Sequence, residues 1–240
     1  SSVRAAVADA RHFNMTSQSL TITRLSVTDS EFTQQLQRSL QREMLIAEDV
    51  TEIVTAILKD VRTRGDQAVL EYTRKFDDFA ATSIQDLVVS REQMLASLEN
   101  LSDPQRQALE HAAQRIGSYH ERQKQGSWRY QEADGSIYGQ KVSALERVGV
   151  YVPGGKANYP SSVLMLAIPA KVAGVKEIIV TVPTAYGPEA DLVFAAAALA
   201  GVDRLFTLGG AQAIAALAYG TESIPRVDKI TGPGNIFVTV

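Results

Sequence analysis

Residues 148–160 read VGVYVPGGKANYP, an apolar run that ends in a turn rich in glycine and proline. Short apolar runs with such endings are typical of buried strands. The sequence predicts four strands of this kind, at 148–152, 177–182, 204–208 and 229–231. The segments between them have helical length, at 161–173, 188–200 and 211–219. This alternation predicts an α/β fold, a Rossmann-like parallel sheet with flanking helices.

The residues before this stretch are mainly helical by pattern. Apolar residues recur three and four positions apart from about Thr51, and Gly65 suits the position just after that helix. Asp66 can cap the next helix, and Asp103-Pro104 can begin a third that reaches about Lys124. A mainly helical segment is therefore expected ahead of the sheet.

The composition of the chain changes near residue 150. Residues 1–150 hold 18 Lys+Arg and 21 Asp+Glu, whereas residues 151–240 hold 6 of each and most of the glycine and proline. Asp134-Gly135, between two aromatic runs, predicts a hairpin. We therefore expect an N-terminal arm (1–30), a mainly helical part of a first domain with a hairpin near 128–142 (31–150), and a Rossmann-like nucleotide-binding domain (151–240). Residues 1–14, which precede Met15, could be a non-native remnant and do not enter this prediction.

Overall composition argues against several classes of protein. The net charge of −3 gives no basic field for nucleic acid. The most apolar stretch, 161–183, is interrupted by Lys171, Lys176 and Glu177, so no membrane span is expected. The absence of cysteine excludes disulfides and thiolate metal sites, and it fits a cytoplasmic location.

The loops that leave the predicted strands are the best candidates for a ligand site. In a parallel sheet the carboxyl ends of the strands share one edge, where ligands bind. These loops cover 153–158, 183–187, 209–212 and 232–235, and three of them contain closely spaced glycines. Glycine lets a backbone approach a ligand, and helix amino termini attract anions, so a phosphorylated ligand such as a dinucleotide fits. Tight turns between strand and helix explain the same glycines equally well, and neither G-x-G-x-x-G nor a P-loop is present.

Groups for metal or acid/base chemistry are scarce. The three histidines, His12, His111 and His120, precede the glycine-rich block and lack the spacing of a zinc site. If the protein is an acid/base or metal enzyme, its working groups are expected outside these residues. The sequence stops at Val240 inside what reads as another element, so we expect an amino-terminal piece of a longer protein.

Several strings, taken together and in order, closely resemble the histidinol dehydrogenase family. They are GVYVPGGK at 149–156, YPSSVLM at 159–165, GGAQAIAA at 209–216, VDKI at 227–230 and GPGN at 232–235. The resemblance extends from about Ile22 to Val240. It implies an NAD-linked, zinc-dependent, cytoplasmic homodimer that oxidises L-histidinol through L-histidinal to L-histidine, in histidine biosynthesis.

The resemblance also assigns cofactor-binding residues. The NAD-contacting tyrosine, glutamine and asparagine of the family match Tyr151, Gln212 and Asn235, all on the predicted ligand edge. A core aromatic and an ordinary turn residue are the competing interpretations for Tyr151 and Asn235. The zinc ligands, the Glu-His acid/base pair and the substrate-binding serine of the family match positions after Val240. No catalytic or metal-binding residue is therefore expected in this chain, and the isolated chain is expected to be inactive.

Two other functions stay open on this reading. One is a dehydrogenase of the same family that acts on another amino or hydroxy alcohol. The other is a noncatalytic nucleotide-binding module that regulates or scaffolds a partner. In each case a small molecule, rather than a nucleic acid or a membrane, is the expected ligand.

Overall fold

The computed structural model describes residues 24–77, 79–154, 159–183 and 188–240. The chain divides into two compact units, residues 1–46 and 47–240. The described part of the first unit is a turn followed by the first half of helix α2 (Phe32–Arg64). The second unit contains the sheet and is the one described below.

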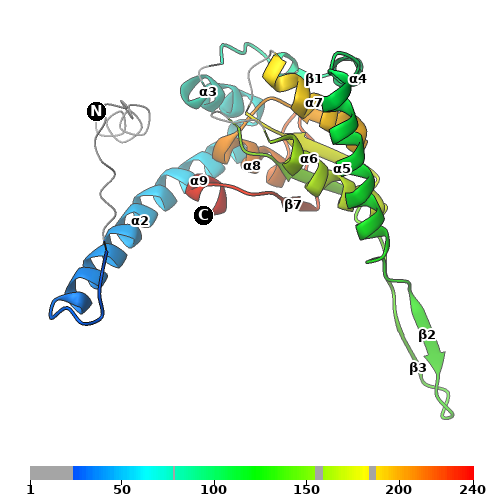
Figure 1. Ribbon diagram of the computed structural model, residues 1–240, viewed down its shortest axis with the longest axis horizontal. Coiled ribbons are helices and arrows are strands. Elements are labelled where there is room, and N and C mark those ends of the chain that lie inside the picture. Colours follow the sequence, from blue (N-terminus) through cyan, green and yellow to red (C-terminus); the bar gives the residue numbers. More distant parts are fainter. Residues whose placement is uncertain (1–23, 78, 155–158, 184–187) are drawn as a thin grey trace. The chain divides into compact units, whose positions relative to one another are not determined.

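A five-stranded sheet forms the centre of the second unit, in the order β1-β6-β5-β4-β7 (Figure 1). Its parallel strands are β4 (Arg147–Tyr151), β5 (Glu177–Thr181), β6 (Arg204–Phe206) and β7 (Lys229–Thr231). The four predicted strands and the predicted α/β class are therefore confirmed. A fifth strand, β1 (Val88–Val89), was not predicted; it pairs antiparallel with β6 at the edge of the sheet.

Three crossover helices connect the parallel strands, as predicted. They are α6 (Pro160–Val172), α7 (Pro188–Ala200) and α8 (Gly210–Tyr219). Because helices cover both faces, the strands read as continuous apolar runs rather than as alternating ones. Val150 and Val180 lie in the core on the α6 and α7 side, whereas Tyr151 and Ile179 lie in the core on the α8 side.

Helices from before residue 150 complete both layers. Helices α4 (Arg91–Glu99) and α5 (Asp103–Glu121) pack on α7 and α6, and α3 (Asp66–Phe76) packs on α8. The change in composition near residue 150 thus falls within β4, and both cores combine residues from either side of it. The predicted division of the chain at residue 150 stays a prediction.

Some helix boundaries differ from the expectation. Helix α2 begins at Phe32 rather than near Thr51, and α4 was not predicted. Gly65 does follow α2, with a φ of +53° that favours glycine. The prediction that Asp66 caps α3 is wrong, because Asp66 is the first residue of that helix and its own N–H is bound by Glu222 at 2.8 Å.

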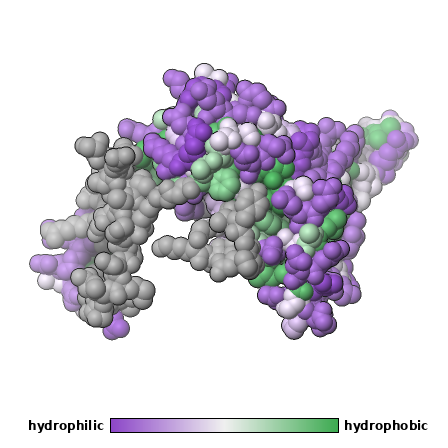
Figure 2. Space-filling view, turned by 90° about the horizontal axis from the view of Figure 1, so that it is seen from above, coloured by the Kyte–Doolittle hydropathy of each residue, from purple (hydrophilic) through white to green (hydrophobic). Residues whose placement is uncertain are grey.

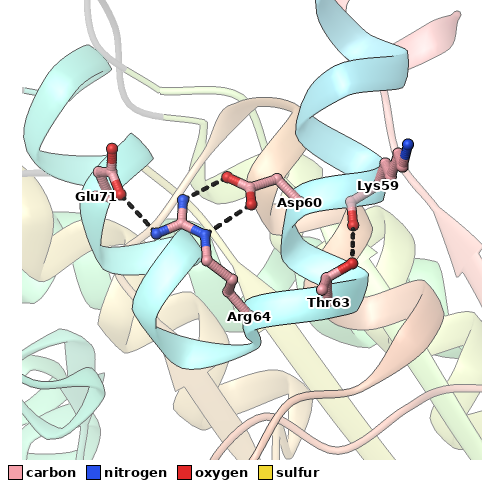
Figure 3. A network of polar contacts seen from close by, with 5 residues as sticks. All are labelled: Lys59, Asp60, Thr63, Arg64 and Glu71. Carbon is pink, nitrogen blue, oxygen red and sulfur yellow. Dashed lines mark hydrogen bonds and ion pairs between the residues drawn. The ribbon is translucent and has the colours of Figure 1, made fainter.

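Charged side chains link α2 to α3 just before Gly65 (Figure 3). The Arg64 guanidinium binds Asp60 through two nitrogens, at 2.7 and 2.5 Å, and Glu71 at 2.8 Å. The hydrogen bonds from Arg64 hold the pKa of Asp60 below its usual value. Within this network, the contact between Arg64 and Glu71 connects the end of α2 to α3.

The predicted hairpin is confirmed and projects beyond the end of α5 (Figure 1). Strands β2 (Trp128–Gln131) and β3 (Ile137–Gln140) are exposed along their whole length. The rings of Trp128, Tyr130 and Tyr138 stack in a row, with centroids 6.2 and 5.6 Å apart. Figure 2 shows apolar side chains on this projection, which is the faint part at the upper right.

The buried central strands should dominate the stability of this unit. Ile179→Ala, at a site with 0% exposure, should lower the free energy of unfolding by about 2–5 kcal/mol, because it leaves a cavity between the sheet and α8. Urea unfolding followed by circular dichroism measures this change. Met165→Ala is the matched control, since Met165 is 63% exposed and its truncation should cost less than about 0.5 kcal/mol. Equal losses in the two variants would contradict the described core.

Candidate functional site

The carboxyl ends of the parallel strands lie on one edge of the sheet, and the candidate site is built there. Strands β4, β5, β6 and β7 end at Tyr151, Thr181, Phe206 and Thr231. Parts of two of the predicted ligand loops, 155–158 and 184–187, lie outside the described residues. The site is therefore described from Tyr151, the start of α8 and the segment after β7.

Tyr151 is the last residue of β4, and its ring is buried on the α8 side of the sheet. Its hydroxyl accepts a hydrogen bond from the Gly210 N–H at 3.3 Å. Burial raises the pKa of Tyr151 above its usual value, the Gly210 N–H opposes that effect, and the charge of Asp77 adds to it. The phenol is therefore protonated at neutral pH and can donate as well as accept a hydrogen bond.

Gln212 lies in the first turn of α8 and is only 1% exposed. Its Nε2 donates to Oδ2 of Asp77 at 3.3 Å. The Oε1 atom lies above Gly210, 2.7 Å from the point where a Cβ of that residue would stand. Tyr151 and Gln212 thus both lie close to Gly210, the partly exposed residue that begins α8.

Asn235 follows β7 on the same edge but is bound differently. It is exposed, and its Oδ1 accepts the Phe237 N–H at 3.0 Å, so it caps the short helix α9 (Ile236–Thr239). Helix α9 packs against α8, and β7 pairs with β4. The structure therefore brings Tyr151 and Gln212 together, and it places Asn235 on the same edge with its side chain turned to its own helix.

The glycines of these loops are explained largely by contacts within the chain. A Cβ on Gly154 would lie 2.1 Å from the carbonyl oxygen of Pro183, and one on Gly209 would lie 2.5 Å from the Pro183 ring. A Cβ on Gly232 would lie 2.0 Å from the carbonyl oxygen of Tyr151. These three positions support the interpretation as tightly packed turns. Gly210 differs, because the atom nearest to its missing Cβ belongs to Gln212, a candidate ligand-binding side chain.

Asp77 is the member of the site that sequence reasoning missed. It follows α3, and its contact with Gln212 joins residues 135 positions apart. A local pattern cannot reveal such a contact. The one sequence signal was a carboxylate directly after helix α3, which packs on α8.

A surface cavity lies elsewhere on the molecule. It has a volume of about 240 Å³ and lies beside β1 and the start of β6, where Arg91, Asp203 and Arg204 contribute to its lining. None of Tyr151, Gln212 and Asn235 lines it. Geometry and hydrogen bonding, rather than concavity, therefore define the candidate site.

The described part of the chain shows neither a metal-binding cluster nor a membrane-spanning helix. There, three or more His, Cys, Asp or Glu side chains do not come together as a metal site would require. On α5, His111 is exposed and His120 is half-buried, and His120 binds Gln123. Among the same residues, the helices are too short or too polar to span a bilayer.

Comparison with known proteins gives a consistent result. The family model of histidinol dehydrogenase matches residues 40–240. A histidinol dehydrogenase of Pseudomonas aeruginosa is 57% identical over 217 residues, which cover 90% of this chain and 49% of that protein. One from Dechloromonas aromatica is 56% identical over 217 residues, with coverage of 90% and 50%. The chain spans about half the length of these curated relatives.

A solved structure supports the fold. The crystal structure of histidinol dehydrogenase from Elizabethkingia anophelis matches with a TM-score of 0.73 and 36% sequence identity. The match covers 79% of this chain and 43% of that one. The likeness therefore extends from the sequence strings to the arrangement of the sheet and its helices.

The start of α8 should not tolerate a side chain at Gly210. Gly210→Ala should lower the free energy of unfolding by about 1–3 kcal/mol, because φ is +65° and the new Cβ would meet Gln212 Oε1. Thermal and urea unfolding measure this change. Gly126→Ala is the matched control: Gly126 has open space around it, so its substitution should change stability by less than about 1 kcal/mol. A neutral Gly210→Ala would contradict the described turn.

Proposed function

We propose that this chain, which belongs to the histidinol dehydrogenase family, is the nucleotide-binding part of an NAD-dependent enzyme that oxidises L-histidinol through L-histidinal to L-histidine. The family match and the residues gathered around Gly210 support this proposal. Its biological role would be in histidine biosynthesis, in the cytoplasm. The substrate would be a small molecule, with no nucleic acid or membrane as partner.

One observation carries the proposal: Tyr151 and Gln212 both lie close to Gly210, at the start of α8. The Tyr151 hydroxyl accepts the Gly210 N–H, and the Gln212 amide oxygen lies beside the point where a Gly210 Cβ would stand. A phenol can donate and accept, an amide oxygen can accept, and the N–H groups at the start of α8 favour an anion. Ribose hydroxyls and phosphate oxygens of a dinucleotide offer matching partners. The residues at this edge therefore fit NAD in chemistry and in position, at the carboxyl ends of parallel strands.

NAD, when bound, supplies the acceptor for the hydride that leaves the alcohol. The residues of this chain would bind and orient it. Tyr151 is buried against its own chain, so its hydroxyl would exchange the hydrogen bond from the Gly210 N–H for one to the cofactor as the cofactor enters. Asn235, already exposed after β7, would add an amide from the segment that leads into α9.

The described residues do not fit a zinc site, and we assign no step through zinc to this chain. We propose that the zinc ligands, the acid/base pair and the substrate-binding serine belong to the other half of the family's chain. We propose that this other half follows the matched region, which is about half of the relatives' length. We also propose that the whole protein is a homodimer.

NAD⁺ binding tests the proposal directly. Titration of the chain with NAD⁺ in a calorimeter should give saturable binding. Tyr151→Phe should weaken it about three- to tenfold, because one hydrogen bond is lost. Tyr138→Phe, which removes an exposed hydroxyl on the hairpin, should leave the affinity unchanged. Absence of saturable binding, or equal loss in both variants, would contradict the proposed site.

Zinc binding and enzymatic activity of the isolated chain test whether the zinc ligands and the catalytic groups lie in the other half of the family's chain. Titration of the isolated chain with Zn²⁺ should show no tight stoichiometric site, and L-histidinol with NAD⁺ should give no NADH absorbance above background. The reason is that the described residues lack a ligand cluster. One tightly bound zinc per chain, or measurable turnover, would show that the catalytic groups lie in this chain after all.

A further inference from the structure

Asp77 contacts the candidate cofactor site from the end of α3, a helix that packs on α8 on the same face of the sheet. It lies directly after α3, whereas Gln212 belongs to α8. Gln212 Nε2 donates to Asp77 Oδ2 at 3.3 Å. Among the described residues, Asp77 thus joins the cofactor edge to a helix that precedes the parallel strands in the sequence.

The chemistry of this contact fixes which way the Gln212 amide faces. A carboxylate accepts hydrogen bonds and does not donate them, and of the two amide atoms only the nitrogen donates. The nitrogen must therefore face Asp77, which leaves the oxygen above Gly210. Because the Gln212 side chain is 1% exposed, a reversed amide would place two acceptors against each other with no water to separate them.

The position of Asp77 is itself held by contacts at the other end of α3. The Asp66 side chain accepts a hydrogen bond from the Ser223 hydroxyl at 2.5 Å, and Glu222 binds the Asp66 N–H. Ser223 and Glu222 follow α8 in the sequence, so α3 is tied to both ends of the α8 region. Asp77 therefore stands at a defined place relative to Gln212.

We propose that Asp77 is a positioning residue that makes Gln212 a hydrogen-bond acceptor toward the bound dinucleotide. This inference rests on the proposed function, and it specifies which groups of the cofactor Gln212 can bind. Phosphate oxygens only accept, so the amide oxygen beside Gly210 would pair with a hydroxyl of a ribose or with an N–H of a base or carboxamide. Gln212 thus recognises a donor group of the cofactor rather than its pyrophosphate.

A second effect of Asp77 agrees with this assignment. Its negative charge contributes to the raised pKa of Tyr151. Burial is the larger cause of this raised pKa, and a phenol is protonated at neutral pH even at its ordinary pKa of about 10, so Tyr151 can complement the acceptor on Gln212. Asp77 in this way influences both side chains that flank the start of α8.

Binding of NAD⁺ to Asp77 variants tests the inference. Asp77→Ala should weaken NAD⁺ binding by about fivefold or more, because the amide loses the partner that orients it. Asp77→Asn retains an acceptor oxygen and should recover most of the affinity. In a Gln212→Leu background, Asp77→Ala should have no further effect. Asp134→Ala, which removes an equal charge from the hairpin turn, is the control and should bind like the wild-type chain.

A merely structural role gives different results. If Asp77 only joins two helices, Asp77→Ala lowers the melting temperature but leaves the NAD⁺ affinity of the folded chain unchanged, and the inference is then wrong. The side-chain NH₂ signals of Gln212 in ¹H–¹⁵N spectra provide the independent readout, and they should shift in Asp77→Ala and remain near their original position in Asp77→Asn. If the wild-type chain does not bind NAD⁺, the proposed function fails and this inference fails with it. If the wild-type chain binds NAD⁺ and the Asp77 variants bind it with the same affinity, the inference alone fails.

Discussion

The whole arrangement depends on the rule that parallel strands cannot be joined by tight turns. The chain needs a crossover between each parallel strand and the next, from β4 through β5 and β6 to β7. Each crossover carries the chain back to the edge of the sheet where the previous strand began, so all four strands run in the same direction. The ends of the strands therefore gather on one edge, together with the starts of the helices. Tyr151 and Gly210 come within hydrogen-bonding distance because of this topology, although two strands separate them in the order of the chain.

Much of the sheet could be predicted because strands that are buried on both faces consist of nearly continuous runs of apolar residues. The runs at 148–152 and 177–182 are apolar throughout or nearly so, and glycine or proline follows them. Strand β1 leaves no such mark: it has two residues, Val88 and Val89, and exists because β6 offers a free edge. Helix α2 extends back to Phe32 through residues rich in Gln and Arg, which favour a helix without marking a buried face.

The candidate site could be predicted only in part, and for related reasons. Tyr151 ends strand β4 and Gln212 lies in the first turn of α8, and both positions fall on the edge where a parallel sheet gathers its strand ends, so their neighbourhood followed from the fold class. The role of the glycines could not be predicted from the sequence, because the space left by a missing Cβ can be filled either by a ligand or by a neighbouring loop. Pro183 fills the space beside Gly154 and Gly209, which only coordinates can show. Asp77 was missed because its role depends on a long-range contact.

The hairpin has a consequence for spectroscopy. The chain contains a single tryptophan, Trp128, and it lies on β2, half exposed and stacked near Tyr130. Its fluorescence therefore reports on the projecting hairpin rather than on the sheet. A thermal unfolding curve recorded by tryptophan fluorescence follows the unfolding of the hairpin. Any molecule that settles on this projection would change the quantum yield of one known residue, so the protein carries a native fluorescent label at its extremity.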